Sequence, residues 1–316
     1  MAGIGVILNR NAGRKGLPFR GNIGKKLAFV LGDPNSLKET EEISEIDQVI
    51  SSFREREIDI LGISGGDGSN HYVLDACERI YGHDPFPKIA FLCGGTHNAH
   101  AMSIGVRGSP EKLLQNILRK YHRRDPFVVT HRVLMKVDDG VRVHHGFSMA
   151  GGFMYRFYEE MVSHQDDSPA HVAKRLALWI GSFAVGGLRI RKLFRLERAH
   201  VWVGKEPLDD WDEMNAFSAS SMEKLGLGFT PYPLASQTPT TFQVGVLRIN
   251  PYVWIKFMWN FKNGTIPVHQ DLFIDIADRF VVETEAPISY VFDGELFDGT
   301  NRVQISTARK LELIVS

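Results

Sequence analysis

Hydrophobic and polar positions alternate in two different ways along this chain, and the pattern changes near residue 128. Before that point, short apolar runs typical of buried strands are separated by segments with apolar residues at helical spacing. The strand-like runs are Ile4–Leu8, Ile58–Ile63 and Lys88–Leu92. Because strands that alternate with helices build parallel sheets, the pattern predicts an α/β domain over residues 1–127.

The segments between the runs predict helices. Ser36 and Glu39 have the spacing of a capping box, and Ser109 followed by Pro110 predicts a second helix start. The apolar faces that support helices after residues 40 and 70 are Ile43, Ile46, Val49, Ile50 and Phe53, and Val73, Leu74, Cys77 and Ile80. Each predicted strand ends in a polar loop that carries glycine, and in open α/β sheets ligands bind at these strand ends. We therefore expect the loops to converge on one site.

From residue 128 onward the apolar positions recur with a period of two. Asp138-Asp139-Gly140 follows one alternating run and predicts a hairpin turn. Further strand-like runs are Ala199–Val203, Phe242–Ile249, Ile288–Phe292 and Val303–Ile305. The pattern predicts a mainly antiparallel β domain over residues 128–316, with one helical insertion near residues 170–195.

Composition narrows the class of protein. Among the 316 residues, 43% are hydrophobic, which is ordinary for a globular domain. Lys plus Arg and Asp plus Glu each number 37, so no global positive charge favours nucleic acid as a partner. Cys77 and Cys93 form no disulfide or zinc pattern, and the N-terminus lacks the features of a secretory signal. We expect a cytoplasmic protein that recognises its ligands locally.

The most informative motif is a glycine-rich turn with one acid inside it. Gly65, Gly66 and Gly68 surround Asp67 directly after a predicted strand. The glycines let backbone N–H groups approach an anion closely, as a phosphate site requires. An acid in the same turn would repel phosphate unless a cation or a reacting hydroxyl lies between them. The turn therefore predicts phosphoryl transfer and not phosphate binding alone.

Three further motifs accompany this turn. They are Asn9 to Gly16 after the first strand, Gly94 to Asn98 after another strand, and Phe292 to Glu295 near the C-terminus. This ordered set resembles the diacylglycerol kinase catalytic-domain family, which includes sphingosine kinases and bacterial lipid kinases and is related to the NAD kinases. Asn9 and Gly13 match the family pattern Asn-Pro-x-x-Gly, with Arg10 in place of proline. Gly65–Ser69 match Gly-Gly-Asp-Gly-Thr, and Gly95–Asn98 match Gly-Thr-x-Asn.

The resemblance implies an ATP-dependent, Mg²⁺-dependent kinase that phosphorylates a hydroxyl of a lipid such as diacylglycerol or a sphingoid-like lipid. It implies that the first domain binds ATP and that the second is a β-sandwich-like domain, which closes a cleft for the lipid. Asp67 or Asp293 would accept the proton of the attacking hydroxyl, and the choice between them stays open. The nucleotide-binding residues would be Asn9, Gly13, Arg14, Lys15, Gly65, Gly66, Gly68, Ser69, Gly95, Thr96, Asn98 and Glu295.

Departures from the family pattern keep other functions open. Ala99 stands where the family usually has Asp, and the stretches Gly151–Tyr155 and Pro233–Thr240 lack acids that the family usually carries. Fewer carboxylates make a poorer metal site. One alternative is therefore a nucleotide- or lipid-binding regulator with weak catalysis. A kinase for NAD or another soluble metabolite is the second alternative.

Two weaker patterns have structural and functional interpretations. His97 and His100 lie one helical turn apart but lack a third metal ligand, so polar residues of the nucleotide cleft are favoured. The basic stretch 170–195 could lie on an anionic membrane, although packing on the β domain is favoured, so peripheral contact with the inner membrane surface stays open. The aromatic runs Tyr252–Ile255 and Phe257–Trp259 are interpreted as core in preference to a lipid pocket.

Overall fold

The structure is a computed structural model that describes residues 3–11, 23–95, 98–162, 188–225 and 228–315. The insertion predicted near residues 170–195 lies mostly outside the described residues, and only its end appears, as helix α8 (Leu188–Leu193). No helix among the described residues combines the length and the apolar character needed to cross a bilayer.

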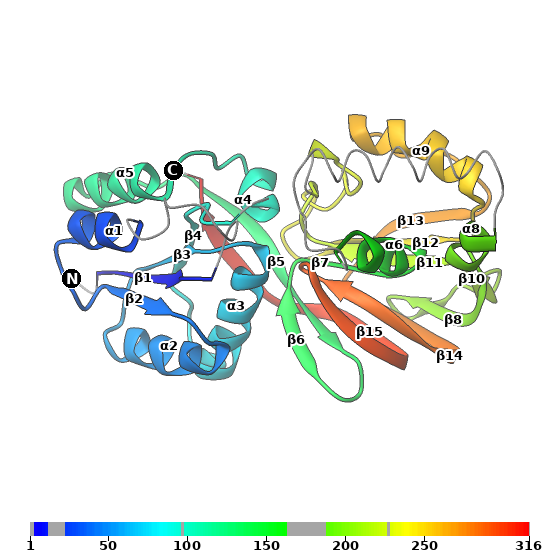
Figure 1. The fold of residues 1–316 in the computed structure, drawn as a ribbon, viewed down its shortest axis with the longest axis horizontal. Coiled ribbons are helices and arrows are strands. Elements are labelled where there is room, and N and C mark those ends of the chain that lie inside the picture. Colours follow the sequence, from blue (N-terminus) through cyan, green and yellow to red (C-terminus); the bar gives the residue numbers. More distant parts are fainter. Residues whose placement is uncertain (1–2, 12–22, 96–97, 163–187, 226–227, 316) are drawn as a thin grey trace.

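The N-terminal domain is an α/β layer structure, shown on the left of Figure 1. Its parallel strands lie in the order β4-β3-β1-β2. They are β1 (Ile4–Asn9), β2 (Leu37–Thr40), β3 (Ile60–Ser64) and β4 (Lys88–Phe91). Helix α1 (Ile23–Leu31) packs beside α5 (Pro110–Arg123) on one side of the sheet, and α2 (Ile46–Glu55) packs beside α3 (Asp67–Tyr81) on the other (Figure 1).

The capping box predicted at Ser36 and Glu39 is wrong. Residues 37–40 form strand β2, which pairs in parallel with β1 from Val6 to Asn9. The edge of β1 satisfies the backbone N–H and C=O groups of this segment, so a helix turn is not needed there. A short 3₁₀ turn (Ile43–Glu45) precedes α2 instead, and the Glu45 carboxylate accepts the backbone N–H of Glu42 at 3.0 Å.

The C-terminal domain consists mainly of antiparallel strands, as the period-two pattern predicts. One path through its sheet runs β13-β12-β11-β7-β14-β15, with β5 on β15 and β8 on β14. The predicted hairpin is present, with Asp138 opposite Val143. The strands are β5 (Val129–Asp138), β6 (Val143–Gly146), β7 (Ser148–Gly152), β8 (Glu197–Val203), β9 (Glu206–Pro207), β10 (Glu213–Met214), β11 (Ala216–Ser220), β12 (Phe242–Leu247), β13 (Leu272–Ala277), β14 (Arg279–Phe292) and β15 (Glu295–Ile314).

The second half holds more helix than the single predicted insertion. Helix α6 (Phe153–Val162) follows β7, and α9 (Pro251–Asn263) follows β12. Asn250 caps α9, because its side-chain oxygen accepts the N–H groups of Tyr252 at 3.0 Å and Val253 at 3.1 Å. An Asn cap followed by Pro at the first helical position is an ordinary helix start. The aromatic runs after Asn250 therefore lie on a helix.

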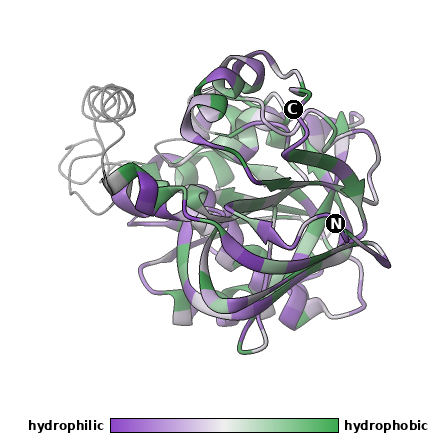
Figure 2. Cartoon of the chain, turned by 90° about the vertical axis from the view of Figure 1, so that its right-hand side faces the viewer, coloured by the Kyte–Doolittle hydropathy of each residue, from purple (hydrophilic) through white to green (hydrophobic). Residues whose placement is uncertain are grey.

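Strand β15 connects the two domains. It pairs with β14 and β5 in the C-terminal domain and then reaches β4, where Leu313 lies opposite Ile89 in parallel. Leu311, Leu313 and Ile314 belong to the same buried cluster as the strands of the α/β domain. The view from the C-terminal domain in Figure 2 shows hydrophobic stretches along the strands and mixed bands along the helices. The chain end thus holds the β14–β15 turn in a fixed position relative to the first sheet.

Candidate active site

Two glycine turns touch each other at the strand ends of the α/β domain. Gly65 and Gly66 follow β3, and Gly94 and Gly95 come soon after β4. A Cβ atom on Gly95 would lie 2.3 Å from the Gly66 Cα, and one on Gly94 would lie 2.7 Å from the Gly65 nitrogen. Side chains at Gly94 and Gly95 would therefore push the turns apart. The sequence places glycine where two backbones meet.

The acid-containing turn is also the beginning of helix α3. The helix begins at Asp67, with Gly66 as its N-cap, so Asp67, Gly68 and Ser69 form its first turn. The first N–H groups of a helix have no partner within the helix and carry a partial positive charge. The Asn9 amide at the end of β1 donates to the Ser69 hydroxyl at 2.8 Å. An anion-binding end therefore lies beside the loop after β1, as the resemblance implies.

Asn98 closes the turn after β4. Its backbone is left-handed, with φ of 49°, a conformation that Asn tolerates better than most residues. Its side-chain oxygen accepts the Gly95 N–H at 2.9 Å, and its amide donates to the Gly95 carbonyl at 2.8 Å. The predicted residues Gly13, Arg14, Lys15 and Thr96 lie outside the described residues.

The Asp67 carboxylate joins α3 to the short helix α4 (Ala99–Ser103). It accepts the backbone N–H of Ala99 at 3.0 Å and that of His100 at 3.1 Å. Its side chain is nevertheless 18% exposed, and a carboxylate has more acceptor positions than these two bonds use. Asp67 is therefore held in a fixed orientation while it remains accessible to a ligand.

The second candidate acid, Asp293, has a different environment. Asp293 and Gly294 form the two-residue turn between β14 and β15, with φ values of 47° and 89°. The Asp293 carboxylate accepts the backbone N–H of Phe147 at 3.0 Å and that of Ser148 at 2.8 Å, and its side chain is 0% exposed. A Cβ on Gly146 would lie 2.1 Å from this carboxylate, so no room is left for a ligand on that side.

His100 lies between the two acids. Its Nε2 is 3.1 Å from the Asp293 carboxylate and its Nδ1 is 3.5 Å from Asp67, while the amide nitrogen of Asn70 lies 3.2 Å from the same Nδ1. Burial alone would lower the pKa of His100, but the charges of Asp293 and Asp67 outweigh it and raise the pKa to about 9. A cationic imidazole thus links the two domains at neutral pH.

The sequence does not reveal this role of His100. In the sequence, His100 forms a short-range pattern with His97, which lies outside the described residues. The partner of His100 in the structure, Asp293, is 193 residues away. Within the described part of the chain, no group of three side chains is arranged to hold a metal ion. His100 is buried between acids and does not line an open cleft.

Glu295 places a carboxylate against the first turn of α3. A Cβ on Gly68 would lie 2.4 Å from the Glu295 Oε1, so this acid lies against the first turn of α3. Burial and then Glu295, which accepts a hydrogen bond from the Tyr72 hydroxyl, raise the pKa of Tyr72. Tyr158 of α6 donates to the Gly294 carbonyl at 3.1 Å and fixes the turn that carries Glu295. Asp67 and Glu295 therefore flank Gly68.

Histidines also form the contact between α3 and β6. The His145 Nδ1 lies 2.8 Å from the Asp75 carboxylate, and the His71 Nδ1 donates to the His145 carbonyl at 3.0 Å. His71 is fully buried, and this burial lowers its pKa, so it is neutral where His100 is charged. The two domains thus meet through one charged histidine near the acids and a neutral one farther along α3.

Comparisons with known proteins agree with this geometry. Residues 3–128 match the family model for the diacylglycerol kinase catalytic domain. The chain is similar to the crystal structure of a diacylglycerol kinase from Bacillus anthracis str. Sterne, with 16% identity over 99% of this chain and 96% of that chain and a TM-score of 0.66. It is also similar to a yeast NADH kinase complexed with NADH, with 10% identity over 99% and 84% of the two chains and a TM-score of 0.52.

No curated protein matches the sequence significantly. The family match confirms the predicted resemblance over residues 3–128, and the structural neighbours confirm the predicted fold class. The family match supports a kinase.

Proposed function

We propose that this protein transfers the γ-phosphoryl group of ATP to a hydroxyl of a lipid or lipid-like molecule. The observation that carries the proposal is the first turn of α3, where helix N–H groups and the accessible carboxylate of Asp67 lie side by side. The N–H groups suit a phosphate, and the carboxylate suits the hydroxyl that attacks it. Phosphate binding alone would not require the acid.

Asp67 is the better of the two candidates for the proton acceptor. Its side chain is 18% exposed, whereas that of Asp293 is 0% exposed and is surrounded by N–H donors. In the proposed step, the acceptor oxygen bonds to the γ-phosphorus and the bond from that phosphorus to the bridging oxygen breaks. ADP leaves, and the hydroxyl proton passes to Asp67. The N–H groups of α3 and its neighbours hold the phosphates in line.

Glu295 suits a divalent cation at the same place. Mg²⁺ in kinases is held by one or two carboxylates together with substrate phosphates, so a cluster of three protein ligands is not required. Glu295 lies against Gly68, and its turn is held by the Tyr158 hydrogen bond. Bound Mg²⁺ would neutralise negative charge on the phosphoryl oxygens. Glu295 and the exposed edge of Asp67 are the described acids that fit it.

Asp293 and His100 act as positioning residues in this proposal. Asp293 fixes Phe147 and Ser148 of the C-terminal domain, and His100 ties it to the helix whose N-terminus Asp67 caps. The pair therefore sets the distance between the nucleotide side of the site and the domain proposed to admit the acceptor.

The experiment that tests the function is a transfer assay with γ-labelled ATP, Mg²⁺ and a panel of acceptors. The panel contains dispersed diacylglycerol and sphingoid base, and NAD and a sugar as soluble acceptors. We expect label on a lipid only, and a loss of about 10²- to 10⁴-fold in Asp67→Asn, the range for a missing proton acceptor. Asp209→Asn, an exposed acid in the C-terminal domain, is the matched control and should retain full activity.

Two results of this assay would reject the proposal. Transfer only to NAD or the sugar would identify a soluble-metabolite kinase, which the similarity to the yeast NADH kinase leaves open because it shows the fold alone. Equal transfer by wild type and Asp67→Asn would remove Asp67 from the mechanism.

A nucleotide-binding regulator is the second candidate, and one observation favours it. The family acid expected at position 99 is Ala99, whose N–H is used by Asp67, so the site has fewer carboxylates than the family pattern. Calorimetry with ATP and Mg²⁺ separates the candidates. Saturable binding without turnover of any acceptor supports the regulator, and multiple turnovers remove it.

A further inference from the structure

Helix α9 exposes large hydrophobic side chains. The opposite face buries Phe257 and Phe261, but Tyr252 is 59% exposed and Trp259 is 74% exposed. These two residues are seven positions apart, so they lie on nearly the same side of the helix. Ile266 at 38% and Val268 at 99% exposure follow in the segment after the helix. The interpretation of the two aromatic runs as core is therefore wrong for Tyr252 and Trp259.

Single exposed hydrophobic residues are common, but this group is concentrated. Four of the large exposed hydrophobic side chains among the described residues fall between positions 252 and 268. The Trp259 indole combines an apolar body with one N–H donor, and the Tyr252 side chain has the same amphipathic character. Trp and Tyr are the residues enriched where protein meets the polar boundary of a bilayer.

The charged side chains of the segment 250–270 are all basic. From Asn250 to Gln270 the sequence contains Lys256 and Lys262 and no Asp or Glu, although acids and bases balance over the whole chain. Lys256 is exposed between Tyr252 and Trp259 on α9. Two copies of this face would place lysines against lysines, which is unfavourable. A surface of negative charge is complementary to it.

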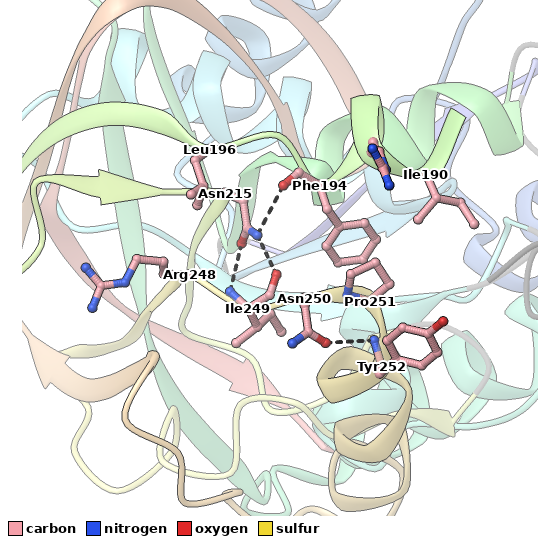
Figure 3. A pocket seen from close by; sticks show the side chains of 10 residues that line it. Ile190, Phe194, Leu196, Asn215, Arg248, Ile249, Asn250, Pro251 and Tyr252 are labelled. Atoms are coloured by element: carbon pink, nitrogen blue, oxygen red, sulfur yellow. Dashed lines mark hydrogen bonds between the residues drawn. The ribbon is translucent and has the colours of Figure 1, made fainter. Parts of the chain in front are cut away.

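A pocket extends this face at the beginning of α9. It has a volume of 530 Å³ and lies between α8 and α9, with Tyr252 and Arg191 among its lining residues. Figure 3 shows the Tyr252 ring at one side of the pocket and the Asn215 amide bonded to Phe194 and Ile249 at its base. Arg191 is exposed, so the lining of the pocket includes an accessible cation. The pocket is of a size to take a charged head group.

The helices that carry this face are connected to the proposed active site. Residues of α6, α8 and α9 share one buried cluster over the sheet of the C-terminal domain. Within it, Phe153 of α6 stacks on Phe194 and meets Trp254 of α9 edge to face. About one and a half turns farther along α6, Tyr158 contacts Gly294 beside Glu295. A surface that holds α9 would therefore also orient the acids.

We propose that the exposed residues Tyr252, Lys256 and Trp259 of α9, together with Ile266 and Val268 of the segment after it, dock on an anionic lipid bilayer. The apolar side chains enter the boundary between head groups and acyl chains, and the basic residues contact lipid phosphates. The contact is peripheral and needs no nucleotide. This inference rests on the proposed function only in that it explains how a lipid acceptor reaches the site.

The test is co-sedimentation of the full chain with vesicles, without nucleotide. One set contains phosphatidylcholine alone, and the other contains equimolar phosphatidylcholine and phosphatidylglycerol. We expect binding to the anionic set that weakens as salt is raised. Trp259→Ala should lower the partition coefficient about tenfold, and Lys256→Gln about fivefold. Phe29→Ala is the matched control, because Phe29 is 89% exposed on α1 in the other domain.

The design separates docking from folding and from catalysis. The substituted residues are exposed, so circular dichroism and the thermal midpoint should match those of wild type. Phosphorylation of a detergent-dispersed acceptor should be retained in Trp259→Ala. Vesicle binding that depends on Trp259 supports docking even if no lipid is phosphorylated, in which case only the proposed function fails. Unchanged binding of Trp259→Ala would overturn docking, and so would a lipid-free dimer that Trp259→Ala dissociates.

Discussion

Asp67 and Asp293 are acids in similar glycine-containing motifs, but they occupy opposite kinds of environment. Asp67 lies at a helix N-terminus with 18% of its side chain exposed, whereas the Asp293 side chain is 0% exposed. Two backbone N–H groups hold each carboxylate, and the His100 Nε2 is a further partner of Asp293 at 3.1 Å. Solvent access separates the two acids most clearly. Asp67 can therefore contact a ligand, whereas Asp293 holds the two domains in position.

His100 is the physical link between the two acids, and its charge depends on both. Because its imidazole is buried and flanked by two carboxylates, removing either acid changes more than one bond. Substitution of the anchoring acid, Asp293, should therefore change mainly stability, and substitution of the accessible acid, Asp67, should change mainly activity.

The largest effect is expected when the buried acid is removed. Asp293→Ala leaves the N–H groups of Phe147 and Ser148 unpaired and His100 without its closer partner. The free energy of unfolding should fall by about 3 to 5 kcal/mol, the range for breaking a buried charge pair. Urea unfolding measures it, with Asp298→Ala, at an exposed position of β15, as a control expected to change by less than about 0.5 kcal/mol. A loss below about 1 kcal/mol would remove the anchoring role.

The second effect is a pH dependence of stability. The pKa of His100 rises from 6.5 to about 9 on folding, so its charged form stabilises the fold fully below pH 6.5. This stabilisation is lost as the pH rises through 9, and it amounts to at most about 3 kcal/mol. Unfolding in urea at several pH values measures the slope between these limits. His100→Gln should have no such slope, and an unchanged slope in that variant would assign the effect to another group.

The third effect concerns the glycine turns on the Asp67 side. Gly95→Ala places a Cβ 2.3 Å from the Gly66 Cα, whereas a Cβ on Gly66 comes no closer than 3.7 Å to Gly95. We expect Gly95→Ala to cost about 1 to 3 kcal/mol, as overpacking does, and to weaken nucleotide binding. Gly66→Ala should cost less than about 1 kcal/mol. Calorimetry and urea unfolding of both variants measure the contrast, and equal costs would show that the turns separate easily.

The smallest effect on stability is expected at Asp67. Asp67→Ala removes the acceptor for the first N–H groups of α4, and loss of such a cap costs about 1 kcal/mol. Thermal unfolding measures this change beside that of Asp293→Ala. If Asp67→Ala destabilises the protein as strongly as Asp293→Ala, the two acids have the same structural role and the comparison fails.

Local pattern predicted much of the fold. The apolar runs located β1, β3 and β4, and the cap at Ser109 with Pro110 located α5. The Asp-Gly step after Asp138 located a hairpin, since turn chemistry acts over a few residues. The same local reasoning missed β2, because the edge of β1 supplied its partners, and it missed α9 in spite of the Asn250 cap. The charged sequence of β2 and the aromatic sequence of α9 did not indicate these elements, because the surrounding structure outweighed local composition.

For the site, the sequence by itself determined which residue types are present: glycines where backbones meet, a hydroxyl at Ser69, and acids at Asp67, Asp293 and Glu295. Only the tertiary structure decided which acid is accessible, because burial of Asp293 depends on Phe147 and Ser148 from a distant strand. It also decided the charge of His100, whose partner lies 193 residues away. Propensity and turn geometry are local properties, whereas solvent access and pKa depend on everything that surrounds a side chain.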